Sequence, residues 1–79
     1  MNGELLDRVR AERVRSDARY GPAQERGYTP HQWVAALVEE VGEVARTLNK
    51  EEGKGRLIEE LIQVAGVAMA AVTALEGNE

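Results

Sequence analysis

Two segments of the chain place acidic side chains at the edges of apolar helical patterns. One reads LVEEVGEVARTL (residues 37–48) and the other begins RLIEELIQVAG (residues 56–66). Side chains three residues apart lie on one stripe of a helix, and each segment holds one such polar pair. If the two helices pack antiparallel, both pairs meet at the border of the core, where their oxygens suit Mg²⁺ or Mn²⁺. The predicted metal ligands are Glu40, Glu43, Glu60 and Gln63.

Two further acids, Glu39 and Glu59, point about 100° away from these stripes. We expect them to support the ligands, to activate a water molecule or to lie on the surface. Glutamate is also a strong helix former, so one acidic pair alone would be ordinary surface decoration. Its repetition on two successive helices favours a catalytic centre. The candidate catalytic residues are Glu39, Glu40, Glu43 and Glu60.

The hydrophobic periodicity predicts three helices and no strand. The first helix spans residues 4–19 with a weak apolar stripe, and a loop rich in glycine and proline follows. The second spans residues 30–49, and the third spans residues 56–76 with Gly77 just past its end. The predicted fold class is therefore all-α, with one small helical domain over residues 1–79.

The second helix has a well-marked start. Thr29 is a good N-cap, Pro30 suits the first helical position, and Gln32 completes a capping box. From Val34 to Leu48 the apolar residues then follow a single helical stripe.

The second half of the third helix is apolar nearly all round. Thr73 is the only polar side chain between Val64 and Leu75. Such a helix needs cover on several sides, which two other helices do not supply. We therefore expect a bundle of about three helices that is completed by homo-oligomerisation, as a homodimer or homotetramer. Small residues such as Gly66 and Ala70 would let a second copy approach closely.

The amino-acid composition excludes several kinds of site and partner. The chain has 79 residues and no cysteine, so disulfides and thiolate metal sites are excluded. Its net charge of −4 argues against a nucleic acid polymer as partner. The longest nearly apolar run covers residues 64–75, whereas a membrane span needs about 20 residues. We expect a soluble cytoplasmic protein with no membrane partner.

With these motifs, the sequence resembles the MazG-like nucleoside triphosphate pyrophosphohydrolases of the all-α NTP pyrophosphatase superfamily. The resemblance covers about residues 19–75 and rests on EEVGEV, then EELIQVAGVA, with Trp33 upstream. The family pattern is E-E-x-x-E, a spacer and then E-x-x-D. Its first half is intact here, while Gln63 stands where the family has aspartate.

The resemblance implies a fold and an activity. Members are helical dimers or tetramers that convert NTPs or dNTPs to the monophosphate and pyrophosphate with Mg²⁺. A metal-activated water attacks a phosphoryl group in line. By this resemblance Glu40, Glu43 and Glu60 are Mg²⁺ ligands and Gln63 occupies the fourth position, where its neutral amide lowers the charge of the site.

Candidate substrate contacts flank the acidic motifs. His31 and Trp33 open the second helix, where the histidine could touch a phosphate and the tryptophan could stack on a base or anchor the core. The phosphate candidates are Arg19, Arg26, Lys50, Lys54 and Arg56, from the same or a neighbouring subunit. We select as substrate-binding residues His31, Trp33, Lys54 and Arg56.

Two other functions remain open at this level. A phosphoribosyl-ATP pyrophosphatase-like enzyme has similar acidic motifs, although HQW and EELIQVA favour the MazG-like side. A helical oligomeric or regulatory module with a weakened catalytic site is the alternative that Gln63 suggests. Pyrophosphate release from a panel of nucleotides separates the three.

Overall fold

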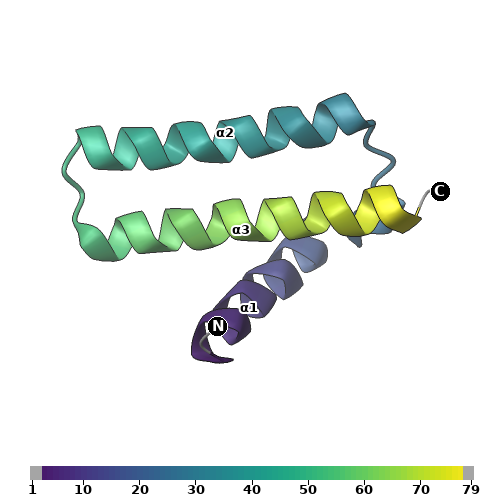
Figure 1. The fold of residues 1–79 in the computed structure, drawn as a ribbon, viewed down its shortest axis with the longest axis horizontal. Coiled ribbons are helices and arrows are strands. Elements are labelled where there is room, and N and C mark those ends of the chain that lie inside the picture. Colours follow the sequence, from purple (N-terminus) through teal and green to yellow (C-terminus); the bar gives the residue numbers. More distant parts are fainter. Residues whose placement is uncertain (1–2, 78–79) are drawn as a thin grey trace.

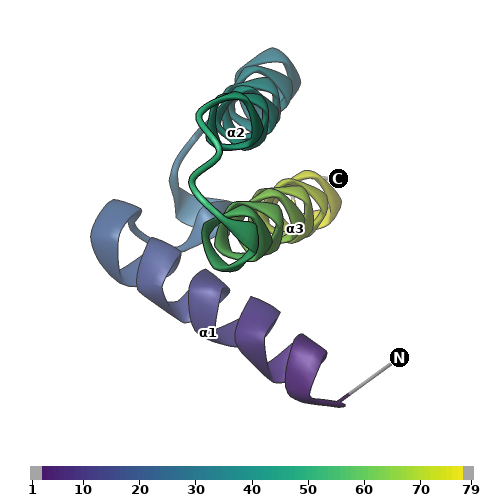
Figure 2. The same ribbon diagram turned by 90° about the vertical axis from the view of Figure 1, so that its left-hand side faces the viewer.

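The computed structural model describes residues 3–77, and all regular elements within that range are helices. The elements are α1 (Gly3–Tyr20), the short 3-10 helix η1 (Ala23–Glu25), α2 (Pro30–Asn49) and α3 (Lys54–Gly77). α2 and α3 lie side by side and antiparallel (Figure 1). α3 lies between α2 and α1, which crosses it at an angle (Figure 2). The prediction of an all-α fold with three main helices is confirmed.

α2 has the predicted boundaries, and those of α1 and α3 differ from the predicted ones by one or two residues. The short helix η1 was not predicted. α3 begins at Lys54, because the carbonyl of Gly53 already accepts a helical hydrogen bond from Leu57 N at 3.1 Å. Gly53 is the last residue of the loop, and its φ of +97° is a conformation that glycine adopts readily. At the other end α3 includes Gly77, so the prediction that this glycine lies outside the helix is wrong.

The start of α2 follows the sequence prediction closely. Gln32 N donates to Thr29 Oγ1 at 3.1 Å, and Thr29 N donates to the Gln32 side-chain oxygen at 2.8 Å. Pro30 occupies the first turn. This reciprocal capping box satisfies two backbone donors and fixes the direction in which α2 leaves the loop.

A buried arginine holds the loop between α1 and α2. Arg26 donates from Nε to the carbonyl of Gly21 at 2.8 Å and forms an ion pair with Asp17 at 3.0 Å. Its side chain is only 6% exposed, and Asp17 also pairs with Arg13 at 3.0 Å. Because a buried charge is stable only when it is paired and hydrogen-bonded, these contacts tie the loop to the end of α1.

The core consists of one aromatic side chain and three alanines. Trp33 from α2 is 2% exposed and clusters with Ala23, Ala70 and Ala74. A tryptophan fills the space that small residues on α3 leave, and it supplies most of the apolar area of this core. Of the two roles considered for Trp33, the structure shows the core anchor.

The small residues of α3 accommodate other parts of the same chain. A Cβ at Gly66 would lie 3.1 Å from Glu12 Cγ of α1, and Ala70 belongs to the Trp33 cluster. The expectation that Gly66 and Ala70 receive a second copy is therefore wrong. Both residues must be small for packing within a single chain, because α1 and α2 approach α3 from two sides.

α3 is also long and apolar enough to cross a membrane, by length and composition only. Its most apolar window has a mean hydropathy of 1.6 and is 22% buried. The buried core helix of a soluble protein meets the same criterion. The helix as a whole is longer than the 12-residue run seen in the sequence, and the cytoplasmic location stays a prediction.

We predict that Ala70→Leu lowers the thermal midpoint by about 5–15 °C, because overpacking a core costs about 1–3 kcal/mol. Ala35→Leu is the matched control, since Ala35 is exposed on α2. Thermal unfolding followed by circular dichroism measures both. Equal midpoints for the two variants would contradict the packing of Ala70 against Trp33.

Candidate functional site

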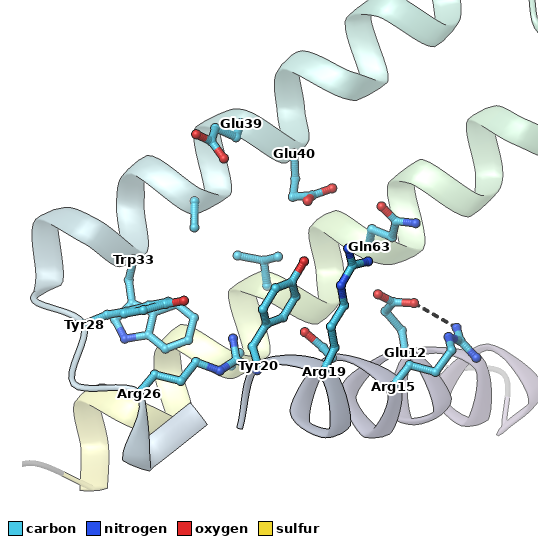
Figure 3. A pocket seen from close by; sticks show the side chains of 14 residues that line it. Glu12, Arg15, Arg19, Tyr20, Arg26, Tyr28, Trp33, Glu39, Glu40 and Gln63 are labelled. Carbon is cyan, nitrogen blue, oxygen red and sulfur yellow. Dashed lines mark hydrogen bonds and ion pairs between the residues drawn. The ribbon is translucent and has the colours of Figure 1, made fainter. Parts of the chain in front are cut away.

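A pocket opens on the side of the molecule where α1, α2 and α3 meet (Figure 3). Its cavity volume is about 540 Å³, within the size range of small-molecule sites. Three kinds of side chain line it: acids with one amide, arginines, and aromatic rings. Side chains from all three main helices therefore line the pocket.

The first wall is acidic. α2 contributes Glu39 and Glu40, α1 contributes Glu12, and α3 contributes Gln63. In the orientation that satisfies its hydrogen bonds, the Gln63 amide donates to Glu40 Oε2 at 3.1 Å and to Glu60 Oε2 at 3.3 Å. The structure thus brings together three of the four predicted metal ligands.

Crowding of carboxylates changes the chemistry of Glu40. Its pKa is raised, first by burial and then by the negative charges of Glu60, Glu43, Glu12 and Glu39. Each neighbour makes ionisation of Glu40 less favourable. A cation placed beside these groups would remove that repulsion.

Glu43 and Glu60, two of the four predicted ligands, form ion pairs with arginines. Glu43 forms an ion pair with Arg46, one helical turn further along α2. Glu60 is 2% exposed and pairs with Arg56 at 2.6 Å. Across residues 3–77, no three carboxylate or imidazole groups converge closely enough to hold an ion by themselves. The compact donor set is two carboxylates, from Glu40 and Glu60, with the amide of Gln63.

The second wall is basic and comes from α1. Arg15 is paired with Glu12 at 2.8 Å. Arg19 makes no ion pair within residues 3–77, and its guanidinium lies 5.2 Å from the centre of the Tyr20 ring. Figure 3 shows its side chain directed into the pocket toward Gln63. Arg19 is therefore the cation best placed to meet an anionic ligand beside the acidic wall.

The third wall is aromatic. The guanidinium of Arg26 lies 5.5 Å from the ring centres of Tyr20 and Trp33 and 6.0 Å from that of Tyr28. The rings of Tyr28 and Trp33 are 4.8 Å apart and tilted by 58°. Since Trp33 is almost fully buried, Tyr20, which is 56% exposed, offers the more open ring surface to a ligand.

The residues selected for substrate binding from the sequence are dispersed in the structure. Trp33 lines the pocket, whereas His31 and Lys54 are exposed and lie outside its lining. Arg56 is engaged with Glu59 and Glu60 away from the pocket lining.

The sequence reasoning did not select the residues that α1 contributes. Glu12, Arg15 and Arg19 recur at spacings of three and four, which places them on one face of a helix. Although Arg19 was considered as a phosphate contact, nothing in the sequence showed that this face turns toward the acids. The polar periodicity of the first helix was the available signal.

No family model matches the chain, and comparison with curated proteins and with solved structures gives no match either.

We predict that Glu40→Gln raises the thermal midpoint at pH 7.5 in metal-free buffer. A carboxyl whose pKa is raised by folding destabilises the folded state once it ionises, and the penalty disappears below about pH 4, where the carboxyl is protonated in both states. The gain should therefore shrink as pH falls. Glu76→Gln, on an exposed position of α3, is the control. A gain for Glu40→Gln that is equal at pH 7.5 and pH 4 would contradict the crowded acidic wall.

Proposed function

We propose that this protein is a Mg²⁺-dependent nucleotide pyrophosphohydrolase that converts a (d)NTP to the (d)NMP and pyrophosphate. One observation carries the proposal: an acidic wall, Arg19, which has no ion pair within residues 3–77, and an aromatic wall line the same pocket. The parts of a nucleoside triphosphate, which are a base, a sugar and a charged triphosphate, match these walls of the pocket. The resemblance of residues 39–43 and 60–63 to the MazG-like motifs supports the same activity.

The donor set fits a hard divalent cation once the Gln63 amide is turned. Glu40 and Glu60 offer carboxylate oxygens within one small region, and the repulsion on Glu40 favours a positive charge there. A bound ion would turn the Gln63 amide so that its oxygen, and not its nitrogen, faces the two carboxylates. Glu40, Glu60 and Gln63 would hold the metal, and Glu43 lies close enough to act on Glu40 through its charge. When bound, Mg²⁺ stabilises the charge that develops on phosphoryl oxygens.

The chain's own residues supply the remaining parts of the reaction. Arg19 binds the phosphates and neutralises their charge, because its guanidinium is unpaired within residues 3–77 and faces Gln63. The ring of Tyr20 positions the base. Glu39 accepts a proton from water as the water oxygen bonds to phosphorus and the α–β anhydride bond breaks. Pyrophosphate then leaves from the open side of the pocket.

A second candidate is a helical module whose catalytic site is weakened. The hydrogen bonds from the Gln63 amide to both Glu40 and Glu60 favour it. Such an amide lowers the repulsion between two carboxylates without any metal, which an aspartate at this position does not do. Metal binding and turnover separate the two candidates.

We expect pyrophosphate release in the presence of Mg²⁺ from at least one member of a panel of NTPs, dNTPs and phosphoribosyl-ATP. Glu40→Gln and Arg19→Gln should each lower kcat/KM by about 10²-fold or more, because each removes a charge that acts on the phosphates. His31→Ala, outside the pocket lining, should change little. No release from any nucleotide would refute the proposed activity.

Replacing Gln63 by aspartate should strengthen Mg²⁺ binding. The change restores a negative ligand where the amide now donates to two carboxylates. Calorimetric titration of wild type and Gln63→Asp gives the two dissociation constants, with Gln24→Asp as a control on an exposed position of η1. Weaker binding by Gln63→Asp would indicate that the amide itself is a selected feature of the site.

A further inference from the structure

The part of the pocket away from the acidic wall is bounded by aromatic rings, and we call it the aromatic slot. Figure 3 shows Tyr20 on one side of the slot and Tyr28 with Trp33 on the other. Small apolar side chains complete the lining, from Ala36, Val67 and Ala70. A space bounded by rings and small apolar groups suits a flat, neutral ring better than a phosphate.

Arg26 lies at the floor of the aromatic slot. Its guanidinium is 5.5 Å from the ring centres of Tyr20 and Trp33. Nε donates to the carbonyl of Gly21, and Nη2 donates to Asp17. Nη1 makes no hydrogen bond within residues 3–77 and is not fully buried, and Nη2 keeps a further N–H beside it. Because Arg26 lines the pocket, this free end of the planar fork is the part that a ligand reaches.

The contacts of Arg26 and Arg19 give them different roles. Asp17 lies 3.0 Å from Arg26 and offsets its charge, whereas Arg19 makes no ion pair within residues 3–77. Arg19 therefore attracts the phosphates, and Arg26 supplies directed hydrogen bonds. Figure 3 shows Gln63 and Arg26 at opposite ends of the pocket with Tyr20 between them. A nucleotide with its phosphates beside Gln63 thus reaches Arg26 with the edge of its base that is farthest from the sugar.

This far edge differs between the bases. Guanine presents two neighbouring acceptors there, O6 and N7, and hypoxanthine shares both. Adenine places its N6 amino donor beside N7, and cytosine presents its N4 amino donor. Uracil and thymine offer a single acceptor, O4. A fork of N–H donors therefore matches the 6-oxopurines and opposes an amino group, which would point a donor at a donor.

We propose that the aromatic slot selects 6-oxopurine nucleotides, with the base stacked on Tyr20 and Arg26 donating to O6 and N7. Because it takes the ligand to be a nucleotide, this selectivity rests on the proposed function, and it adds the class of base. Arg26 is then a specificity-determining residue. The ion pair with Asp17 and the hydrogen bond to Gly21 hold its fork in a fixed orientation, as a two-pronged contact requires.

Binding of nucleoside monophosphates to the full chain tests this selectivity, because such binding requires neither Mg²⁺ nor turnover. Equilibrium dialysis gives the dissociation constants of GMP, IMP, AMP, CMP and UMP. GMP and IMP should bind about tenfold or more tightly than the other three, the discrimination expected of a good two-pronged contact. 7-Deaza-GMP has a carbon in place of the N7 acceptor and should bind about tenfold more weakly than GMP. These comparisons use wild type throughout, so they do not depend on the folding of a variant.

Arg26→Lys tests the fork itself. Lysine keeps a positive charge beside Asp17 but lacks the planar pair of donors, so the ratio of GMP to AMP affinity should fall by about tenfold. Tyr20→Leu removes the 56% exposed stacking ring and should weaken all the monophosphates while keeping that ratio. Arg10→Lys is the matched control at an exposed position of α1 outside the pocket lining, and it should leave the ratio unchanged.

Several results would overturn the selectivity. They are equal binding of GMP and AMP, equal binding of GMP and 7-deaza-GMP, tighter binding of a pyrimidine monophosphate than of GMP, and no binding of any monophosphate. An unchanged ratio in folded Arg26→Lys would exclude Arg26 as the residue that reads the base. Pyrophosphate release without a base preference would refute the selectivity alone. Preference for GMP and IMP without release from any nucleotide would refute the proposed activity alone.

Discussion

The close approach of α1 and α2 to the small residues of α3 is the constraint on which the rest of the structure depends. A Cβ at Gly66 would lie 3.1 Å from Glu12 Cγ and would require that side chain to shift, and Ala70 and Ala74 make space for the ring of Trp33. The core is otherwise small, so one tryptophan supplies much of its buried apolar area. If either approach were lost, the pocket would open, because its lining combines side chains of α1, α2 and α3.

The repulsion between the carboxylates of the acidic wall destabilises this packing. Several carboxylates act on Glu40 across the pocket and raise its pKa, and Glu60 is buried beside them. The chain offsets part of this repulsion with ion pairs to Arg46 and Arg56 and with the amide of Gln63. A cation bound beside these carboxylates would reduce their repulsion, so in the proposed function metal binding would also stabilise the fold.

The two sides of the α2–α3 pair present different side chains. One side receives α1 and forms the pocket with its acids, arginine and rings. The other exposes large apolar side chains, Val34, Val38 and Val41 of α2 among them. The separation follows from two helical stripes on opposite sides of one hairpin.

The sequence by itself determined the three helices, the capping box at Thr29 and the placement of Glu60 and Gln63 on one stripe of a helix, because these depend on local spacing and helical period. The contact of that stripe with Glu40 was a prediction that required antiparallel packing of α2 and α3. The sequence did not determine what the small residues of α3 pack against, since a glycine permits close approach without specifying the partner. Only the tertiary structure decided that α1 turns Glu12, Arg15 and Arg19 toward the acids and that Arg26 is buried among the aromatic rings. These contacts join residues far apart in the chain through the loop between α1 and α2, and the crossing of α1 over α3 depends on packing that no local pattern encodes.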